Sequence, residues 1–166
     1  MSWKVVYVNS RSEKKVGERL TQAGIENYVP LKKELKQWSD RKKMVSSPLI
    51  NGYVFVKPTA LQRDKVLQQA GVIQYVKYNQ SDAIVQDNEI EALRSVETKG
   101  YYAEGNFGAT LKIGDSAIIQ HGPFKGLKGQ IKSTASEDIY YLAIESIDFC
   151  LTLKVPKEIL NPVGRL

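Results

Sequence analysis

Several residue types that would define a chemistry are scarce in this chain. Cys150 is the only cysteine and lies inside an apolar run. A lone cysteine has no disulfide partner and no second ligand at zinc-binding spacing, so we expect a buried thiol. His121 is the only histidine and has no serine or cysteine at a catalytic spacing. We therefore expect no catalytic residues, no metal site and no cofactor, and no enzyme.

Long apolar runs are also missing. No stretch approaches the roughly 20 apolar residues of a membrane span, and the amino terminus lacks a signal-peptide pattern. We therefore expect a cytoplasmic protein with no membrane contact. The chain has 166 residues, of which 42% are hydrophobic and 25% charged. This composition is enough for the core of one ordinary domain or two small ones.

Acidic residues are few in the first third of the chain. Residues 1–57 contain 12 Lys and Arg but 5 Asp and Glu, so the whole positive excess lies there. Such asymmetry indicates a polyanion, most often nucleic acid, although a solvated basic face without a partner is the alternative. Trp38–Arg41 predicts a turn between two exposed strands. We expect this hairpin to contact phosphate through Lys32, Lys33, Lys36, Arg41, Lys42 and Lys43, and Trp38 suits base stacking.

The most apolar stretch is Pro48–Lys57, which predicts a strand buried on both faces. Alternation places Leu49, Tyr53 and Phe55 on one face of that strand. Two aromatic side chains on one face have two interpretations. They pack in a sandwich of helix on sheet, or they form a surface for a partner.

Hydrophobic periodicity predicts the other elements around this strand. Before the central strand we expect a strand at 3–8, a helix to Ala23 capped by Gly24, a strand at 25–29 and the basic hairpin. After it we expect a helix at 61–70, capped by Thr59 and ended by Gly71, and a strand at 72–78. An edge strand at 84–85 and a helix from Asp87 follow. This order predicts an α+β sandwich of about 95 residues.

The last third of the chain predicts only strands. Residues 98–109 have no hydrophobic periodicity and read as a linker whose aromatic residues pack on a domain. Short strands at 115–120, 130–133, 139–147 and 149–155 with tight turns predict a small barrel. The predicted domains are therefore 1–97 and 110–166, joined by 98–109.

Two motifs add a resemblance to a known family. Gly122-Pro-Phe-Lys-Gly-Leu-Lys-Gly-Gln-Ile131 resembles the KOW motif, and Pro48-Leu-Ile-Asn-Gly-Tyr-Val-Phe-Val56 looks like the central strand of the NusG amino-terminal (NGN) domain. The resemblance covers nearly the whole chain. It implies an NGN α/β sandwich, with an antiparallel sheet and flanking helices, followed by a small all-β KOW barrel of the SH3-like type.

The resemblance also implies a function. NusG-family proteins bind RNA polymerase and act on pausing and termination by contacts without chemistry. The positions that match the polymerase-binding face are Tyr7, Lys15, Tyr53, Phe55 and Tyr75. Arg11, Arg41, Lys42 and Lys43 match the face that meets non-template DNA in specialised paralogues. Ile147 matches the KOW position that docks a small-subunit ribosomal protein or the termination factor Rho, and we expect a monomer.

The length and the segment Pro48-Leu-Ile look similar to the specialised RfaH and UpxY paralogues, which act in antitermination on particular operons. Two departures are Asn51, where proline is common, and Gln62-Arg-Asp-Lys65, which keeps the polarity of a gate-loop motif but not its residue types. RfaH can fold its KOW domain as a helical hairpin, but strand propensity predicts a barrel here. The alternative function is a ribosome-associated or RNA-binding KOW module. Residues 110–166 contain 7 basic and 6 acidic residues, which disfavours binding of ribosomal RNA.

Overall fold

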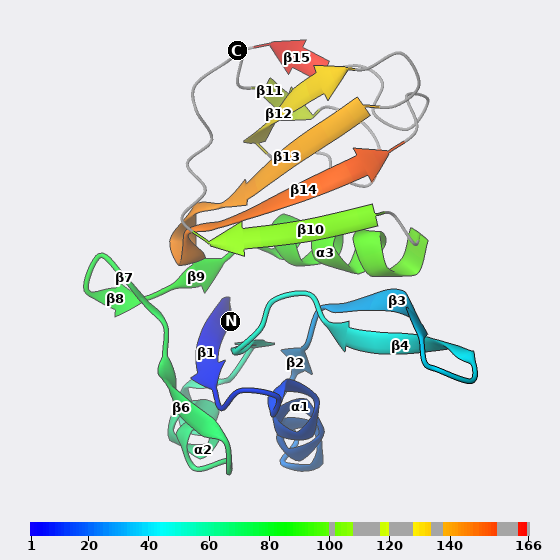
Figure 1. The fold of residues 1–166 in the computed structure, drawn as a ribbon. Helices are drawn as coiled ribbons and strands as arrows, with labels where there is room; N and C mark the ends of the chain where they lie inside the picture. The colour runs from blue at the N-terminus through cyan, green and yellow to red at the C-terminus, as the bar shows by residue number, and fades with distance from the viewer. Residues whose placement is uncertain (100–101, 108–116, 120–127, 134–137, 156–162, 166) are drawn as a thin grey trace. The chain divides into compact units, whose positions relative to one another are not determined.

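The computed structural model describes residues 1–99, 102–107, 117–119, 128–133, 138–155 and 163–165 (Figure 1). The chain divides into two compact units, Met1–Gln86 and Asp87–Leu166. The fold is mixed α/β with an antiparallel sheet and flanking helices, as the sequence predicts.

The first unit is built on an antiparallel sheet with the order β2-β5-β1-β6. Its strands are β1 (Trp3–Val8), β2 (Asn27–Tyr28), β5 (Tyr53–Val56) and β6 (Val72–Tyr75), and β9 (Ile84–Val85) also pairs with β1. The register places Tyr7 opposite Tyr53 and Val6 opposite both Val54 and Tyr75. Because side chains alternate along a strand, Val6 and Tyr7 lie on opposite faces of the sheet.

Two helices, α1 (Glu13–Gln22) and α2 (Arg63–Leu67), pack on the Val6 face. The core between these helices and the sheet consists of the buried side chains Val6, Val8, Val16, Leu20, Ile25, Val54, Val56, Val66 and Tyr75. Helix α1 ends as predicted at Gly24, whose φ is +74°. The amide of Ile25 bonds to the carbonyl of Leu20, and that of Gly24 bonds to Thr21. This is a Schellman cap, and its apolar pair Leu20 and Ile25 is part of the core.

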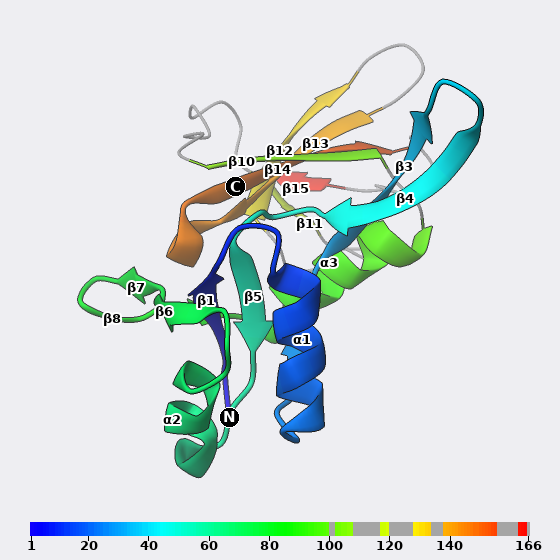
Figure 2. The ribbon, with the colours of Figure 1, turned by 60° about the horizontal axis from the view of Figure 1, so that its bottom comes forward.

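The hairpin predicted at the basic segment is present. Strands β3 (Leu31–Gln37) and β4 (Lys42–Pro48) pair in a continuous register from Leu31 with Pro48 to Gln37 with Lys42. The amide of Trp38 donates to the carbonyl of Arg41 at 2.7 Å and closes the turn. The two strands form a sheet of their own, and Figure 2 shows this ribbon extending beyond the strands of the main sheet.

Several predicted elements are shorter than the sequence pattern indicates, among them the strand predicted at 25–29, of which only β2 forms. The central strand begins only at Tyr53, because residues 49–52 turn and Gly52 has a φ of +80°. The predicted helix at 61–70 is a 3₁₀ helix η1 (Ala60–Gln62) followed by α2, and Gly71 follows with a φ of +97°. The amide of Thr59 donates to Oε1 of Gln62 at 3.0 Å.

The predicted strand at 72–78 is also divided. It breaks at Val76, whose amide bonds to Val5, and continues as β7 (Lys77–Tyr78) in a hairpin with β8 (Ser81–Asp82). Asn79 and Gln80 between them both have positive φ. Two positive φ values at the centre of a two-residue turn match the right-handed twist of paired strands.

The second unit contains helix α3 (Asp87–Lys99), which begins at the predicted Asp87, and an antiparallel sheet with the order β10-β14-β13-β12-β11-β15. The strands are β10 (Tyr102–Phe107), β11 (Ala117–Ile119), β12 (Lys128–Ser133), β13 (Asp138–Ile144), β14 (Phe149–Val155) and β15 (Val163–Arg165), with a 3₁₀ helix η2 (Glu145–Ile147). The described part of 110–166 is thus mostly strands, as predicted, but the strand predicted at 139–147 ends at Ile144 and η2 follows it.

Strand β10 differs from the prediction, because it lies in the segment that the sequence assigns to a linker. It pairs with β14 from Tyr102 opposite Lys154 to Phe107 opposite Phe149. Pairing with a strand almost fifty residues later is not visible in local periodicity. His121, Gly122 and Gly126 lie outside the described residues, and Gly129 lies in β12.

Candidate functional site

The Tyr7 face of the main sheet presents a pair of tyrosines. Tyr7 on β1 and Tyr53 on β5 are directly paired, and their ring centroids lie 4.9 Å apart with an interplanar angle of 56°. Both residues are half-buried, so the pair is partly accessible to solvent. A tilted pair at this separation is a favourable aromatic geometry, and it forms a rigid surface with polar hydroxyl groups.

The turn before Tyr53 is held by a buried carboxylate. Glu13, in the first turn of α1, is 3% exposed, and its Oε1 accepts a hydrogen bond from the amide of Gly52 at 2.8 Å. The carbonyl of Gly52 in turn accepts from the amide of Val8 at 2.9 Å. These bonds fix the start of β5 against both α1 and β1. Sequence reasoning missed Glu13, whose only signal is its position in the first turn of a helix.

The tyrosine pair is not a site for acid–base chemistry. Burial, and then the hydrogen bond with Tyr7, raises the pKa of Tyr53 well above its ordinary value. The phenol therefore stays protonated at neutral pH and serves as a hydrogen-bonding group. This arrangement suits recognition of a protein surface, for which tyrosine is often used.

The predicted polymerase-binding residues do not all lie together. Phe55 shares the face of Tyr53 but is fully buried, with its ring 6.3 Å from that of Tyr28. Lys15 is exposed on α1. Tyr75 lies on the opposite face of the sheet, because the register pairs it with Val6. The prediction did not resolve the faces, since alternation within one strand does not reveal its partner's register.

Tyr75 is held in the core by cations. Its hydroxyl donates to the carbonyl of Arg63 at 3.0 Å, and the Arg63 guanidinium lies 4.7 Å from its ring centroid. Burial raises the pKa of Tyr75 to about 12, although the charge of Arg63 opposes the shift. Tyr75 is only 3% exposed. In this structure it supports α2 and is not available to a partner.

A cluster of charges around Asp82 uses part of the segment predicted as a gate-loop motif. Arg63 Nη2 lies 3.0 Å and Lys4 Nζ 2.9 Å from Asp82 Oδ2, and Lys77 bonds to Oδ1. Gln62 is also engaged, since its Nε2 donates to the carbonyl of Gly24 at 3.0 Å. Asp64 and Lys65 are exposed. Gln62 and Arg63 of this motif are thus bound to segments distant in the sequence, and Asp64 forms an ion pair with Arg63 at 4.0 Å.

The predicted nucleic-acid residues are mostly exposed, and most lie on the ribbon. Lys33, Lys36, Arg41, Lys42 and Lys43 are exposed on β3, β4 or their turn. Lys32 is half-buried and pairs with Glu34 at 2.8 Å. Arg11 is separate from the ribbon in sequence, exposed in the turn between β1 and α1 with a φ of +62°. Lys14 of α1 bonds to the carbonyl of Ser46 and so ties the base of the ribbon to that helix.

Ile147, the predicted partner-binding residue of the second unit, lies in η2 and is buried. Contact with a docking protein therefore requires that this side chain become uncovered.

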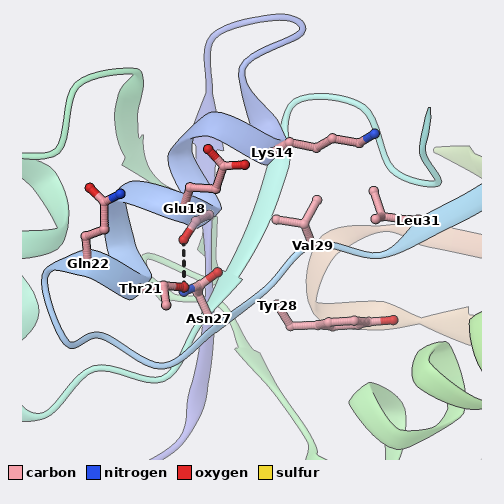
Figure 3. A pocket seen from close by; sticks show the side chains of 9 residues that line it. Lys14, Glu18, Thr21, Gln22, Asn27, Tyr28, Val29 and Leu31 are labelled. Carbon is pink, nitrogen blue, oxygen red and sulfur yellow. Dashed lines mark hydrogen bonds between the residues drawn. The ribbon is translucent and has the colours of Figure 1, made fainter. Parts of the chain in front are cut away.

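A shallow hollow of about 530 Å³ lies between α1 and residues 27–31 (Figure 3). Its lining residues are Lys14, Gly17, Glu18, Thr21, Gln22, Asn27, Tyr28, Val29 and Leu31. The hydroxyl of Thr21 donates to the carbonyl of Gly17 at 3.0 Å and accepts from Asn27 Nδ2 at 2.9 Å. The lining contains no nucleophile paired with a base, so the hollow does not have the features of an active site.

Among the described residues, no group of three or more His, Cys, Asp or Glu side chains could hold a metal ion. In the same part of the chain, no helix is both long and apolar enough to cross a membrane.

Comparisons with known proteins identify the family and the fold. Residues 1–94 match the family model NusG, described as transcription termination factor nusG. The whole chain is similar to a solved structure of Thermotoga maritima NusG, described under domain interaction, with 21% identity and a TM-score of 0.54. That match covers 99% of this chain and 97% of the other. No curated protein matches this chain.

Proposed function

Because the chain belongs to the NusG family of transcription factors, we propose that it binds RNA polymerase through its tyrosine pair and acts on transcript elongation. The specific role is suppression of pausing or termination without enzymatic chemistry. By its resemblance to the RfaH and UpxY paralogues, this role is confined to particular operons.

The observation that carries the proposal is the pair of Tyr7 and Tyr53. These side chains are half-exposed, their rings are 4.9 Å apart, and the turn beside them is fixed by Glu13. A preformed aromatic surface loses little side-chain entropy on binding, and aromatic residues commonly supply most of the binding energy of an interface. Phe55 is buried on the same face, so its part is to pack beside Tyr53. Lys15 is exposed on α1, and its part in this contact rests on the resemblance of the sequence alone.

The second part of the proposal concerns non-template DNA. The β3–β4 ribbon and Arg11 present cations on the first unit, and these cations complement the negative charge of a DNA backbone. Such contacts position a factor on the transcription complex without reading sequence. Any operon specificity needs further contacts to bases.

The remaining parts rest on the resemblance of the sequence. A KOW domain at 110–166 docks a small-subunit ribosomal protein or Rho through Ile147. The protein acts as a monomer in the cytoplasm.

The proposal is tested by measuring the affinity of the labelled full chain for purified bacterial RNA polymerase. Tyr53→Ala weakens binding by roughly 1–3 kcal/mol, the range of an interface hot spot. Tyr78→Ala is the matched control, because Tyr78 is a tyrosine that is 47% exposed in the β7–β8 hairpin, outside the pair. Equal affinities of Tyr53→Ala and the unaltered chain would remove the tyrosine pair from the interface.

A further inference from the structure

The main sheet of the first unit ends at β2, so one side of this strand faces no further strand of the described sheet. The carbonyls of Glu26 and Pro30 both accept hydrogen bonds at 2.8 Å, from amides that flank β5. Because main-chain groups alternate in direction along a strand, the N–H and C=O groups of Asn27 and Val29 point away from β5. These groups form an open edge of the sheet.

The hollow between α1 and residues 27–31 lies beside this edge (Figure 3). Val29 and Leu31 are half-buried and line it with apolar side chains. Gly17 lets the helix lie close to the edge, because a Cβ there would be 2.9 Å from Cγ2 of Val29. A strand added at the edge would run about 4.8 Å from residues 27–31. Every second side chain of that strand would point into the hollow.

The edge is short, which limits what can pair with it. Strand β2 has two residues, and the chain enters the separate sheet of the ribbon at Leu31. Short edge strands keep whole sheets from pairing with one another. An extended peptide as long as residues 27–31 does fit, and a groove between a helix and a sheet edge is where several peptide-binding domains add a strand.

The charges of the lining indicate the chemistry of the peptide. Lys14 is exposed at the ribbon end of the hollow, where its ammonium bonds to the carbonyl of Ser46 in β4. That acceptor is neutral, so the charge of Lys14 can still attract a carboxylate. Glu18 is exposed one turn further along the same side of α1. The hydrogen bond of 2.9 Å between Thr21 and Asn27 closes the opposite end.

We propose that the edge groove binds an extended peptide segment of a partner protein by β-strand addition. The edge groove is defined as Lys14, Gly17, Glu18, Asn27, Val29 and Leu31. The main chain of the peptide bonds to Asn27 and Val29, its apolar side chains fill the hollow, and an acidic side chain meets Lys14. This inference does not rest on the proposed contact with polymerase, because α1 and the tyrosine pair lie on opposite faces of the sheet.

The probe is a library of random short peptides displayed on phage and selected on the immobilised full chain. Enriched sequences are synthesised with a fluorophore, and their affinity for the full chain is measured by anisotropy. The expected sequences have apolar residues at alternate positions and an Asp or Glu at one end. Lys14→Gln weakens binding of such a peptide about 1.5- to 5-fold, the range of an exposed ion pair.

Two controls isolate the charge contact. Lys14→Gln has no effect on the same peptide once its acidic residue is replaced by the corresponding amide. Lys65→Gln, at an exposed position of α2, leaves the affinity for both peptides unchanged. Circular dichroism of each variant checks that the fold is intact.

Two main-chain measurements distinguish strand addition from other modes of binding. Only every second amide of an added strand faces the edge, so N-methylation of one alternate set weakens binding about 2- to 12-fold for each lost bond. N-methylation of the other set leaves the affinity unchanged. In amide exchange followed by NMR, the amides of Asn27 and Val29 become protected at saturating peptide. Tyr28 changes little, because it is already paired with Phe55.

Three results would overturn the inference. The first is a selection that yields no peptide with measurable affinity for the full chain in solution. The second is a bound peptide that leaves exchange at Asn27 and Val29 unchanged and tolerates either set of N-methyl groups. The third is a dimer of the free chain in sedimentation that protects the same two amides, which would assign the edge to a second copy. Failure of the proposed function is distinct, because it appears as unchanged polymerase binding by Tyr53→Ala.

Discussion

The carboxylate of Glu13 accepts a hydrogen bond from the amide of Gly52, 39 residues later, at 2.8 Å. This bond joins the first turn of α1 to the turn that precedes Tyr53. It places a charged group in a site that is only 3% exposed. Buried carboxylates are uncommon, and this one defines the position of the tyrosine pair.

Removing this carboxylate is expected to destabilise the chain. Glu13→Ala removes the acceptor of the partly buried Gly52 amide, which costs about 1–3 kcal/mol in the free energy of unfolding. Glu13→Gln costs less, because an amide oxygen can still accept the bond. Urea unfolding followed by circular dichroism measures both variants. Glu18→Ala, at an exposed position of the same helix, is the control, and an equal loss in Glu18→Ala would refute a special role for Glu13.

Two glycines with positive φ allow a comparison of strain with steric clash. Gly24 and Gly71 have φ values of +74° and +97°. A Cβ on Gly24 would meet no atom within 4 Å, whereas one on Gly71 would lie 2.8 Å from Cγ2 of Val16. Gly24→Ala therefore costs about 1–2 kcal/mol from backbone strain alone. Gly71→Ala costs a further 1–3 kcal/mol from overpacking of the core.

The same urea experiment measures both alanine variants. The account predicts a clearly lower midpoint for Gly71→Ala than for Gly24→Ala. Equal midpoints would mean that the contact between Gly71 and α1 relaxes without cost.

The ion pairs of Asp82 are expected to make the free energy of unfolding fall at acid pH. Burial by itself would raise the pKa of this carboxyl, but hydrogen bonds from Lys77, Lys4 and Arg63 outweigh burial and hold the pKa well below its ordinary value. A depressed pKa in the folded state stabilises the protein above the pKa of the unfolded chain, about 3.9. That contribution is lost progressively as the pH falls below about 4.

The test compares urea midpoints at about pH 6 and pH 3, on either side of the ordinary carboxyl pKa. Asp82→Asn lowers the midpoint at the higher pH and shows a smaller further loss at the lower pH than the unaltered chain. Asp40→Asn, at an exposed position in the hairpin turn, should behave as the unaltered chain does. A parallel acid loss in Asp82→Asn and the unaltered chain would contradict the role of this cluster.

The parts of the fold that local sequence specifies could be predicted. The helix cap at Gly24 follows from the apolar stripe that ends just before a glycine, and the ribbon turn follows from polar residues between exposed strands. The limits of the central strand were less predictable from the sequence. Apolar residues Leu49 and Ile50 read as strand, but Gly52 with its positive φ turns the chain after them.

The candidate site was predictable only in part, because its geometry depends on pairing between distant segments. Tyr53 was identified together with Tyr7, and the register brings them together. Tyr75 was assigned to the same surface, but its pairing with Val6 places it on the other face. Asp82 accepts hydrogen bonds from several segments of the chain, and no local sequence pattern indicates such a cluster.

The most direct measurement is single-round transcription by purified bacterial RNA polymerase on a long template that contains a pause and a terminator. The reaction is run without the protein, with the unaltered chain and with Tyr53→Ala, and a parallel binding experiment verifies that the unaltered chain is bound. The account predicts faster passage through the pause or greater read-through with the unaltered chain, and loss of this effect in Tyr53→Ala. A bound chain that leaves pausing and termination unchanged would contradict it.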